Sequence, residues 1–306
     1  MNLYLKYRPQ EFDQIVGNKD VVDYLVEVVQ DVKTCPHVFL LYGPTGCGKT
    51  TLARIISKKL GCSDMDFREI NTADFRGIDT VREIIRNSRY HSLGGGVRVW
   101  LVDEAHKMTG DAQNALLKLL EDSPEHSYFI LCTTDPNKLL PTVRGRCIQL
   151  QVKVLNDHQM FRVLRNVVKG EEKKLRKSVY DQIIRDSFGQ PRNALQILDR
   201  VLKVSPEQQL ELAKQSAGEY SESIELCRAL IGQSSWKMVR NILSGLKDQD
   251  AESIRRHVLG YSQSVLLGGE NDKAALVIEE FMEPLYNIGF PGLVYACYSV
   301  IKNERL

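Results

Sequence analysis

Short hydrophobic runs alternate with longer segments of helical spacing in the first half of the chain. An apolar run bounded by turn-forming residues is typical of a strand buried on both faces of a sheet. The expected strands are 38–41, 67–71, 97–102, 127–134 and 147–152. Apolar residues at helical spacing fill the segments between them, which are 51–56, 80–90, 109–121 and 142–146. This alternation predicts a parallel sheet with helices on both faces, an α/β fold.

The two ends of the chain follow different patterns. Residues 1–20 are expected to be irregular, and a helix is expected over 20–30, with Asp20 as its N-cap. After Val154 only helical spacing follows. We therefore expect three domains: an α/β domain over 1–155, a three-helix domain over 156–204 and an all-helical domain over 205–306.

Composition limits the possible functions. The 306 residues are 43% hydrophobic and 26% charged, as in an ordinary soluble globular protein. A formal net charge of +2 provides no global basic field, so nucleic acid could bind only at a local patch. No uncharged run approaches the roughly 18–20 residues needed to cross a bilayer, so no membrane is expected as a partner.

Cysteine usage indicates the compartment. None of the seven cysteines forms a Cys-x-x-Cys pair, which argues against a zinc site. An odd number of cysteines, together with a start that lacks a signal peptide, indicates reduced thiols in a cytoplasmic protein.

A complete phosphate-binding loop, G-x-x-x-x-G-K-T, lies between the first expected strand and the helix after it. Glycines let backbone N–H groups turn toward an anion, and the helix N-terminus adds its positive dipole end. Lys49 is expected to reach the β- and γ-phosphates, and the Thr50 hydroxyl is expected to bind Mg²⁺. The expected nucleotide-binding residues here are Gly43, Pro44, Thr45, Gly46, Cys47, Gly48, Lys49, Thr50 and Thr51. The chain is therefore predicted to bind a nucleoside triphosphate.

Two adjacent carboxylates follow the strand 97–102, where an open α/β sheet builds its ligand site. Asp103 is expected to hold the Mg²⁺ shell. Glu104 is expected to orient and deprotonate the attacking water.

Three other residues are candidates by position, and two of them, Thr134 and Arg146, have a structural alternative. Thr134 ends a strand beside the expected site and can bond a γ-phosphate or the attacking water, although a strand-terminal Thr is more often structural. Arg192 follows Pro191, which suits the first position of a helix. Arg146 lies between a helix and the last strand, where an isolated arginine is usually a surface or capping residue.

Several segments occur in an order that resembles a known family. They are 7–9, 43–50, 103–106, 133–139, 146–147 and 189–195. This order resembles the AAA+ ATPase subunits of sliding-clamp loaders, which include the small subunits of replication factor C, the bacterial gamma/tau subunits and the loader ATPases of tailed phages. The resemblance covers roughly residues 4–200 in motifs, and segment 111–118 is among its more specific parts.

The resemblance implies an AAA+ P-loop NTPase domain, followed by a helical lid and an all-α collar that holds subunits in a ring. It assigns Thr134 as sensor 1 and Arg192 as sensor 2. It assigns Arg146 as an arginine finger that enters the ATP site of the neighbouring subunit. The residues expected to line the adenine pocket are Tyr7, Arg8, Pro9, Val16 and Gly17.

Two features depart from the family pattern. Gly145 stands where family members usually have a serine before Arg146, so the finger is expected to be held less firmly. The cysteine cluster with which bacterial gamma/tau subunits bind zinc is absent, which favours the phage or replication-factor type.

The implied function is an ATPase, stimulated by DNA and clamp, that uses ATP and Mg²⁺ to open a sliding clamp and load it on primer–template DNA. The implied partners are the clamp, DNA and other loader subunits in a hetero-oligomeric, pentameric ring. The implied location is the cytoplasm, or the host cytoplasm for a phage protein. One alternative is a branch-migration or replication-fork AAA+ ATPase, against which Arg146, Cys147 and segment 113–116 argue. The other is a non-hydrolysing scaffold, against which the intact Lys49, Asp103, Glu104 and Thr134 argue.

A basic stripe is the candidate DNA contact. Arg82, Arg86 and Arg89 recur at i, i+4 and i+7 on the outer face of one expected helix, and Lys107 precedes the next helix. We expect these residues to contact the DNA phosphate backbone. A solvated helix face is the alternative of equal weight.

Overall fold

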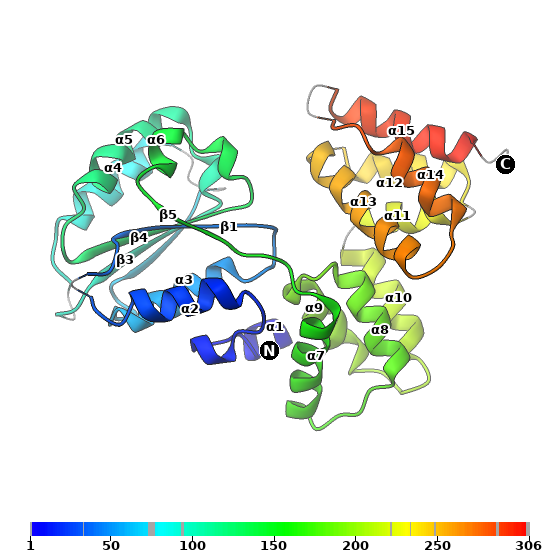
Figure 1. The fold of residues 1–306 in the computed structure, drawn as a ribbon, viewed down its shortest axis with the longest axis horizontal. Helices are drawn as coiled ribbons and strands as arrows, with labels where there is room; N and C mark the ends of the chain where they lie inside the picture. The colour runs from blue at the N-terminus through cyan, green and yellow to red at the C-terminus, as the bar shows by residue number, and fades with distance from the viewer. Residues whose placement is uncertain are drawn as a thin grey trace. The chain divides into compact units, whose positions relative to one another are not determined.

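A five-stranded sheet forms the centre of the α/β part. Its strands are β1 Val38–Tyr42, β2 Phe67–Asn71, β3 Arg98–Asp103, β4 Ser127–Thr133 and β5 Ile148–Gln151. The order is β2-β3-β4-β1-β5, and every neighbouring pair is parallel (Figure 1). Parallel strands end at the same edge, so β1, β4 and β3 bring the segments that follow them together. The predicted α/β fold is confirmed.

Helices cover both faces of this sheet (Figure 1). They are α2 Lys19–Val28 and α3 Lys49–Lys59 on one face, and α4 Ile78–Ser88, α5 Gly110–Glu121 and α6 Pro141–Arg144 on the other. In β1, Phe39 and Leu41 pack with α2 and α3, whereas Val38 and Leu40 pack with α4 and α5. Burial on both faces explains the uninterrupted apolar run, and each fully buried side chain of this size contributes about 2 kcal/mol.

The computed structural model describes residues 2–32, 34–72, 77–92, 95–220, 222–232, 234–247, 249–285 and 288–303, without the side chains of 215–220, 222 and 253. The chain divides into two compact units, which are Met1–Val163 with Gly189–Arg192, and Leu164–Phe188 with Asn193–Leu306. The expected division into three domains stays a prediction.

The N-terminal segment differs from the expectation. It contains two short helices, α1 Leu3–Lys6 and the 3₁₀ helix η1 Phe12–Gln14. The N-cap position of α2 is Asn18, not Asp20, which lies in the first turn. Asn18 has a left-handed backbone (φ 49°), and its side chain exchanges two hydrogen bonds with the backbone of Lys153, at 2.7 and 3.0 Å. The predicted cap at Asp20 is wrong, because the bonds between Asn18 and Lys153 fix the start of the helix two residues earlier.

A buried glutamine fixes the segments that follow β3 and β4. These segments contain the 3₁₀ helices η2 Ala105–Lys107 and η3 Pro136–Lys138. The amide nitrogen of Gln113 donates to the carbonyls of Met108 and Lys138, at 3.2 and 3.3 Å, and its oxygen accepts from the Leu140 N–H at 2.7 Å. One buried side chain thus satisfies backbone groups of both segments.

The remainder of the described chain is helical or connecting. Its helices are α7 Asp157–Gly170, α8 Lys177–Ser187, α9 Pro191–Val201, α10 Gln209–Tyr220, α11 Glu222–Ile231, α12 Trp236–Gly245, α13 Ala251–Leu267, α14 Asp272–Glu280 and α15 Phe290–Lys302. The helical part that the sequence predicted after Val154 is thereby confirmed. Among the described helices, none combines the length and the apolarity needed to cross a bilayer.

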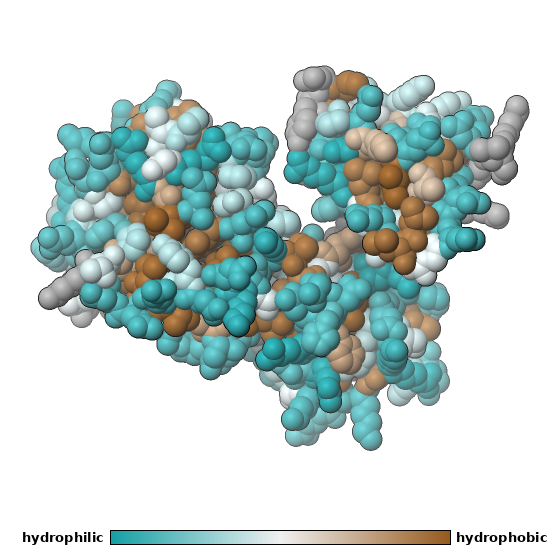
Figure 2. Space-filling model, in the orientation of Figure 1, coloured by the Kyte–Doolittle hydropathy of each residue, from teal (hydrophilic) through white to brown (hydrophobic). Residues whose placement is uncertain are grey.

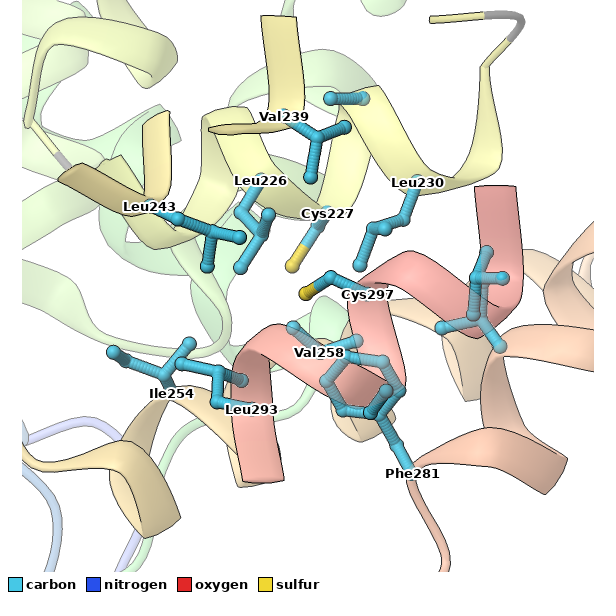
Figure 3. Packing of buried hydrophobic residues seen from close by; sticks show 14 of the residues in the cluster. Leu226, Cys227, Leu230, Val239, Leu243, Ile254, Val258, Phe281, Leu293 and Cys297 are labelled. Atoms are coloured by element: carbon cyan, nitrogen blue, oxygen red, sulfur yellow. The ribbon is translucent and has the colours of Figure 1, made fainter. Parts of the chain in front are cut away.

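Side chains from α11 to α15 and from the segments between them form a hydrophobic core cluster in the second unit (Figure 3). Leu230, Val239 and Val258 lie among its fully buried members. The sulfur atoms of Cys227 and Cys297 point toward one another (Figure 3), and both thiols are free. Burial raises the pKa of both thiols, that of Cys297 to about 12, so they remain protonated and act as small hydrophobic groups.

The last helices also expose hydrophobic side chains. Figure 2 shows a largely hydrophilic surface on which hydrophobic residues gather over part of these helices. Among their described residues, Leu267 is 81% exposed and Tyr295 is 71% exposed.

Candidate active site

The phosphate-binding loop connects β1 to α3 and depends on its glycines. Gly43, Gly46 and Gly48 have φ values of 149°, 72° and 108°. A Cβ atom on Gly43 would lie 2.0 Å from the carbonyl oxygen of Val152, so only glycine fits against the segment after β5. Cys47 is buried, and its thiol donates to the carbonyl of Pro44 at 2.9 Å. The loop is therefore held by its own contacts in a strongly curved conformation.

Lys49 begins α3 and lies inside this curve. Its side chain is buried, and its ammonium donates to the carbonyls of Gly43 and Pro44, both at 2.8 Å. A buried ammonium surrounded by loop carbonyls can exchange these partners for phosphate oxygens.

Thr50 and Asp103 meet although they lie far apart in the sequence. The Thr50 hydroxyl donates to Oδ2 of Asp103 at 2.9 Å. A hydroxyl and a carboxylate are hard oxygen ligands of the kind that Mg²⁺ prefers, so this pair fits the expected metal. The contact forms because the two residues follow β1 and end β3, whose carboxyl ends lie at one edge of the sheet.

Glu104 has an unusual backbone conformation at the end of β3. Its φ is 54°, in the left-handed region, which costs a non-glycine residue about 1 kcal/mol or more. Its N–H donates to Oδ1 of Asp103 at 2.9 Å, and the hydroxyl of buried Thr72 bonds the carbonyls of Asp103 and Glu104 at 2.9 and 2.6 Å. Neighbouring residues thus hold the acidic pair in a strained turn, which is typical of functional sites.

Two basic residues lie next to the carboxylate of Glu104. His106 Nε2 is 3.5 Å from Glu104 Oε2, and Lys107 Nζ is 3.9 Å from it. The other ring nitrogen of His106, Nδ1, is 3.0 Å from Thr133 Oγ1. No sequence pattern indicates a role for His106, Thr133 or Thr72, because each role depends on contacts between segments that follow or end different strands.

Thr134 directly follows β4, the strand between β1 and β3. It is half-buried, and the carbonyl of Thr133 before it accepts from the N–H of Gly43 at 3.2 Å. The structure therefore brings Thr134 beside the first residue of the phosphate loop.

Arg192 also lies against the phosphate loop. Its backbone N–H donates to the carbonyl of Gly46 at 3.4 Å, in the first turn of α9 after Pro191. Burial lowers the pKa of Arg8, and the charges of Arg54 and Arg192 lower it further. Arg192 therefore adds a positive charge beside the loop, where it can attract a triphosphate.

The residues expected around adenine, Tyr7, Arg8, Pro9, Val16 and Gly17, are all half-buried. Gly17 has a φ of 78°, and a Cβ atom there would lie 2.5 Å from Leu155 Cδ2. Leu155 in turn donates its N–H to the carbonyl of Gly189 at 2.8 Å. The structure thus connects part of this set to the segment that carries Arg192.

Arg146 lies away from the phosphate loop of its own chain. It precedes β5, which begins at Ile148 opposite Phe39 of β1. Its backbone is therefore near the amino ends of the strands, roughly 20 Å of strand from Gly43 at about 3.3 Å per residue. Its guanidinium pairs with Glu121 at 2.9 Å and donates to the carbonyl of Thr142 at 3.0 Å. Arg146 cannot reach the site of its own chain.

The candidate DNA contacts are exposed. Arg82 and Arg86 lie on α4, Arg89 follows its last turn, and Lys107 ends η2. Arg82 forms an exposed ion pair with Asp79 at 3.1 Å. A DNA-binding role for these residues stays a prediction.

The strand order, the loop after β1, the acidic pair at the end of β3 and the threonine after β4 together define an AAA+ P-loop ATPase domain. A solved structure supports this class. The chain matches the RuvB Holliday junction branch migration motor of Thermotoga maritima with a TM-score of 0.61 over 79% of this chain and 85% of that chain. The sequence identity is 19%, so the likeness shows the fold alone.

Sequence comparisons specify the class further. A family model described as DNA polymerase III, delta subunit matches residues 17–156. DNA polymerase III subunit gamma/tau of Mycobacterium tuberculosis is 31% identical over 310 residues, which cover 92% of this chain and 50% of that protein. DNA polymerase III subunit tau of Escherichia coli is 31% identical over 218 residues, covering 64% of this chain and 34% of that protein.

The resemblance to AAA+ subunits of sliding-clamp loaders is thereby confirmed, and the chain is similar to bacterial DNA polymerase III gamma/tau subunits. It spans about half the length of the first curated relatives that it matches. These relatives do not support the preference for the phage or replication-factor type that the absent cysteine cluster suggested.

Proposed function

We propose that this chain is an ATP-hydrolysing subunit of a clamp loader, which opens a sliding clamp and places it on primer–template DNA during replication. The observation that carries the proposal is the meeting of Lys49, Thr50 and Asp103 at one edge of the sheet, in a chain similar to gamma/tau subunits.

Each group at this edge has a place in the proposed reaction. Backbone N–H groups of the loop and the Lys49 ammonium bind the phosphates, and Arg192 adds a cation from α9. Thr50 and Asp103 would hold Mg²⁺, which when bound offsets the charge of the phosphate oxygens. Glu104 accepts the proton of the attacking water, and Thr134 orients that water.

The position of Arg146 supports a ring. Because it cannot reach its own loop, its guanidinium serves the ATP site of a neighbouring subunit, in a ring that we expect to be pentameric. The exposed hydrophobic side chains of the last helices, such as Leu267 and Tyr295, support a role of this region in subunit contacts. ATP binding closes the ring around DNA, and hydrolysis releases the loaded clamp.

Steady-state ATP hydrolysis by the full chain tests this function. The rate is measured alone, with a candidate clamp, with primed DNA, and with both. We expect the largest increase with both. ATP binding without hydrolysis under all four conditions would favour the scaffold alternative, and stimulation by branched DNA but not by primed DNA would favour branch migration.

A further inference from the structure

A short series of polar contacts joins the end of β3 to the end of β4. It starts at the Glu104 carboxylate, which is 30% exposed, and passes to His106 Nε2 at 3.5 Å. The His106 side chain is only 10% exposed, and its Nδ1 is 3.0 Å from Thr133 Oγ1. Thr133 is fully buried and immediately precedes Thr134.

We propose that His106 is a positioning residue for Glu104: its Nε2–H orients the carboxylate of the base, while Nδ1 fixes the ring to Thr133. The inference rests on the proposed function, in which Glu104 deprotonates the attacking water.

Electrostatics select the tautomer that this role requires. Burial lowers the pKa of His106, so the ring is neutral near pH 7 and carries one N–H proton. A proton on Nδ1 would turn the lone pair of Nε2 toward the anionic oxygen of Glu104, which is repulsive. A proton on Nε2 instead makes a charge-assisted contact with Glu104, and Nδ1 then accepts from the Thr133 hydroxyl.

The Thr133 hydroxyl is itself held in place. Its oxygen accepts from the Asp135 N–H at 3.1 Å. Its single proton has two acceptors within reach, His106 Nδ1 at 3.0 Å and the Asp135 carbonyl at 3.1 Å, and in the proposed tautomer it goes to His106. The ring of His106 is thus anchored at a fixed point of β4, next to the residue that follows this strand. The 3.5 Å contact with Glu104 is long, as catalytic contacts often are before substrate binds.

Glu104 has a specific need for such a partner. A glutamate side chain has three rotatable bonds, and misplacing a reacting group by about 1 Å can cost about 100-fold in rate. Lys107 is farther away, at 3.9 Å, and its side chain is 38% exposed, so it constrains the carboxylate less. His106 is the more buried of the two neighbours.

Two substitutions of His106 test its contact with Glu104 and its contact with Thr133 separately. In His106→Gln the amide nitrogen reaches the position of Nε2 and keeps a donor toward Glu104. In His106→Asn the shorter amide reaches only the position of Nδ1, which keeps the contact with Thr133. We expect His106→Asn and His106→Ala to lower kcat about tenfold with the Kd for ATP within about twofold, and His106→Gln to stay within about threefold of the parent.

The readouts are the steady-state ATPase rate of the full chain, a fluorescence titration with a labelled ATP, and the thermal unfolding midpoint. A His106→Gln variant as slow as His106→Ala would overturn the proposal. So would a loss of ATP affinity that accounts for the fall in rate. The two amide variants are compared at equal folded fraction, so a defect in folding does not imitate the expected difference.

A double substitution separates this inference from the proposed function. If His106 acts through Glu104, His106→Ala will cause no further loss of kcat in a Glu104→Gln chain. An independent tenfold loss in that background would contradict the inference and leave the proposed function intact. A Glu104→Gln chain with parental turnover would instead contradict the role of Glu104 as the base.

Discussion

Glu104 and Lys49 lie at the same edge of the sheet but act on different parts of the proposed reaction. Glu104→Gln keeps the shape and removes the base, so we expect kcat to fall about 100-fold or more with ATP affinity nearly unchanged. Lys49→Ala removes a buried ammonium that neutralises phosphate charge, so ATP affinity itself should fall. Single-turnover rates and a nucleotide titration measure the two effects separately.

Each of these substitutions has an outcome that contradicts its assignment. Turnover of Glu104→Gln within about threefold of the parent would remove Glu104 as the base. Parental ATP affinity in Lys49→Ala would count against nucleotide binding at this loop.

Helices α8 and α11 are joined by a buried ion pair. Asp186 is fully buried, and Arg228 Nη2 lies 2.6 Å from its Oδ2, which also accepts from Gln182 at 2.6 Å. Arg228→Met leaves this carboxylate buried without its cation, so we expect the free energy of unfolding to fall by about 3 kcal/mol. Urea unfolding followed by circular dichroism measures the change.

A matched variant and the pH dependence test the cause. The double variant Arg228→Met with Asp186→Asn removes the buried charge as well, so it should recover part of the lost stability. A double variant as unstable as Arg228→Met alone would exclude the charge as the cause. Burial raises the pKa of Asp186, and Arg228 opposes that rise. When folding raises the pKa of a carboxyl, the free energy of unfolding of the protein falls as pH increases from the unfolded-state pKa to the folded-state pKa. The defect of Arg228→Met should therefore shrink at low pH.

Assembly decides whether Arg146 can function. Arg146→Ala chains should be nearly inactive alone, because an arginine finger contributes about 10³–10⁵ in rate. Glu104→Gln chains should also be nearly inactive alone, because they lack the base. Mixing them should restore ATPase activity at interfaces that combine an intact Glu104 with an intact Arg146. Arg144→Ala is the matched control, since Arg144 donates to Asn137 rather than to Glu121, and it should keep its activity. Mixed rings without recovery would exclude the action in trans.

The basic stripe on α4 is the predicted contact between the whole protein and the DNA backbone. Replacing Arg82, Arg86 and Arg89 by Ala should weaken DNA binding with little sequence preference. The log–log salt slope should fall by about one for each lost phosphate contact. Lys58→Ala with Lys59→Ala is the control, because both ammonium groups pair with Glu11. Unchanged affinity and slope in the triple variant would leave only the solvated helix face.

Local pattern alone determined the strands, the helices between them and the phosphate-binding loop of this protein. The apolar run 38–41 predicts a strand with both faces buried, because no polar position interrupts it. The sequence predicts the loop equally well, since its glycines and Lys49 act through backbone geometry and charge over a few consecutive residues. The sequence also predicts the acidic pair Asp103 and Glu104, because the two residues are consecutive and directly follow an apolar run.

Only the tertiary structure decided how distant residues meet. The order β2-β3-β4-β1-β5 joins Thr50 to Asp103, supports Glu104 from Thr72 and connects His106 to Thr133. It also places Arg146 near the amino ends of the strands, beyond reach of its own loop. Hydrophobic periodicity specifies which face of a strand is buried, but not which strand lies beside it. Asn18 in place of Asp20 at the start of α2 has the same cause, because its bonds with Lys153 join segments 135 positions apart.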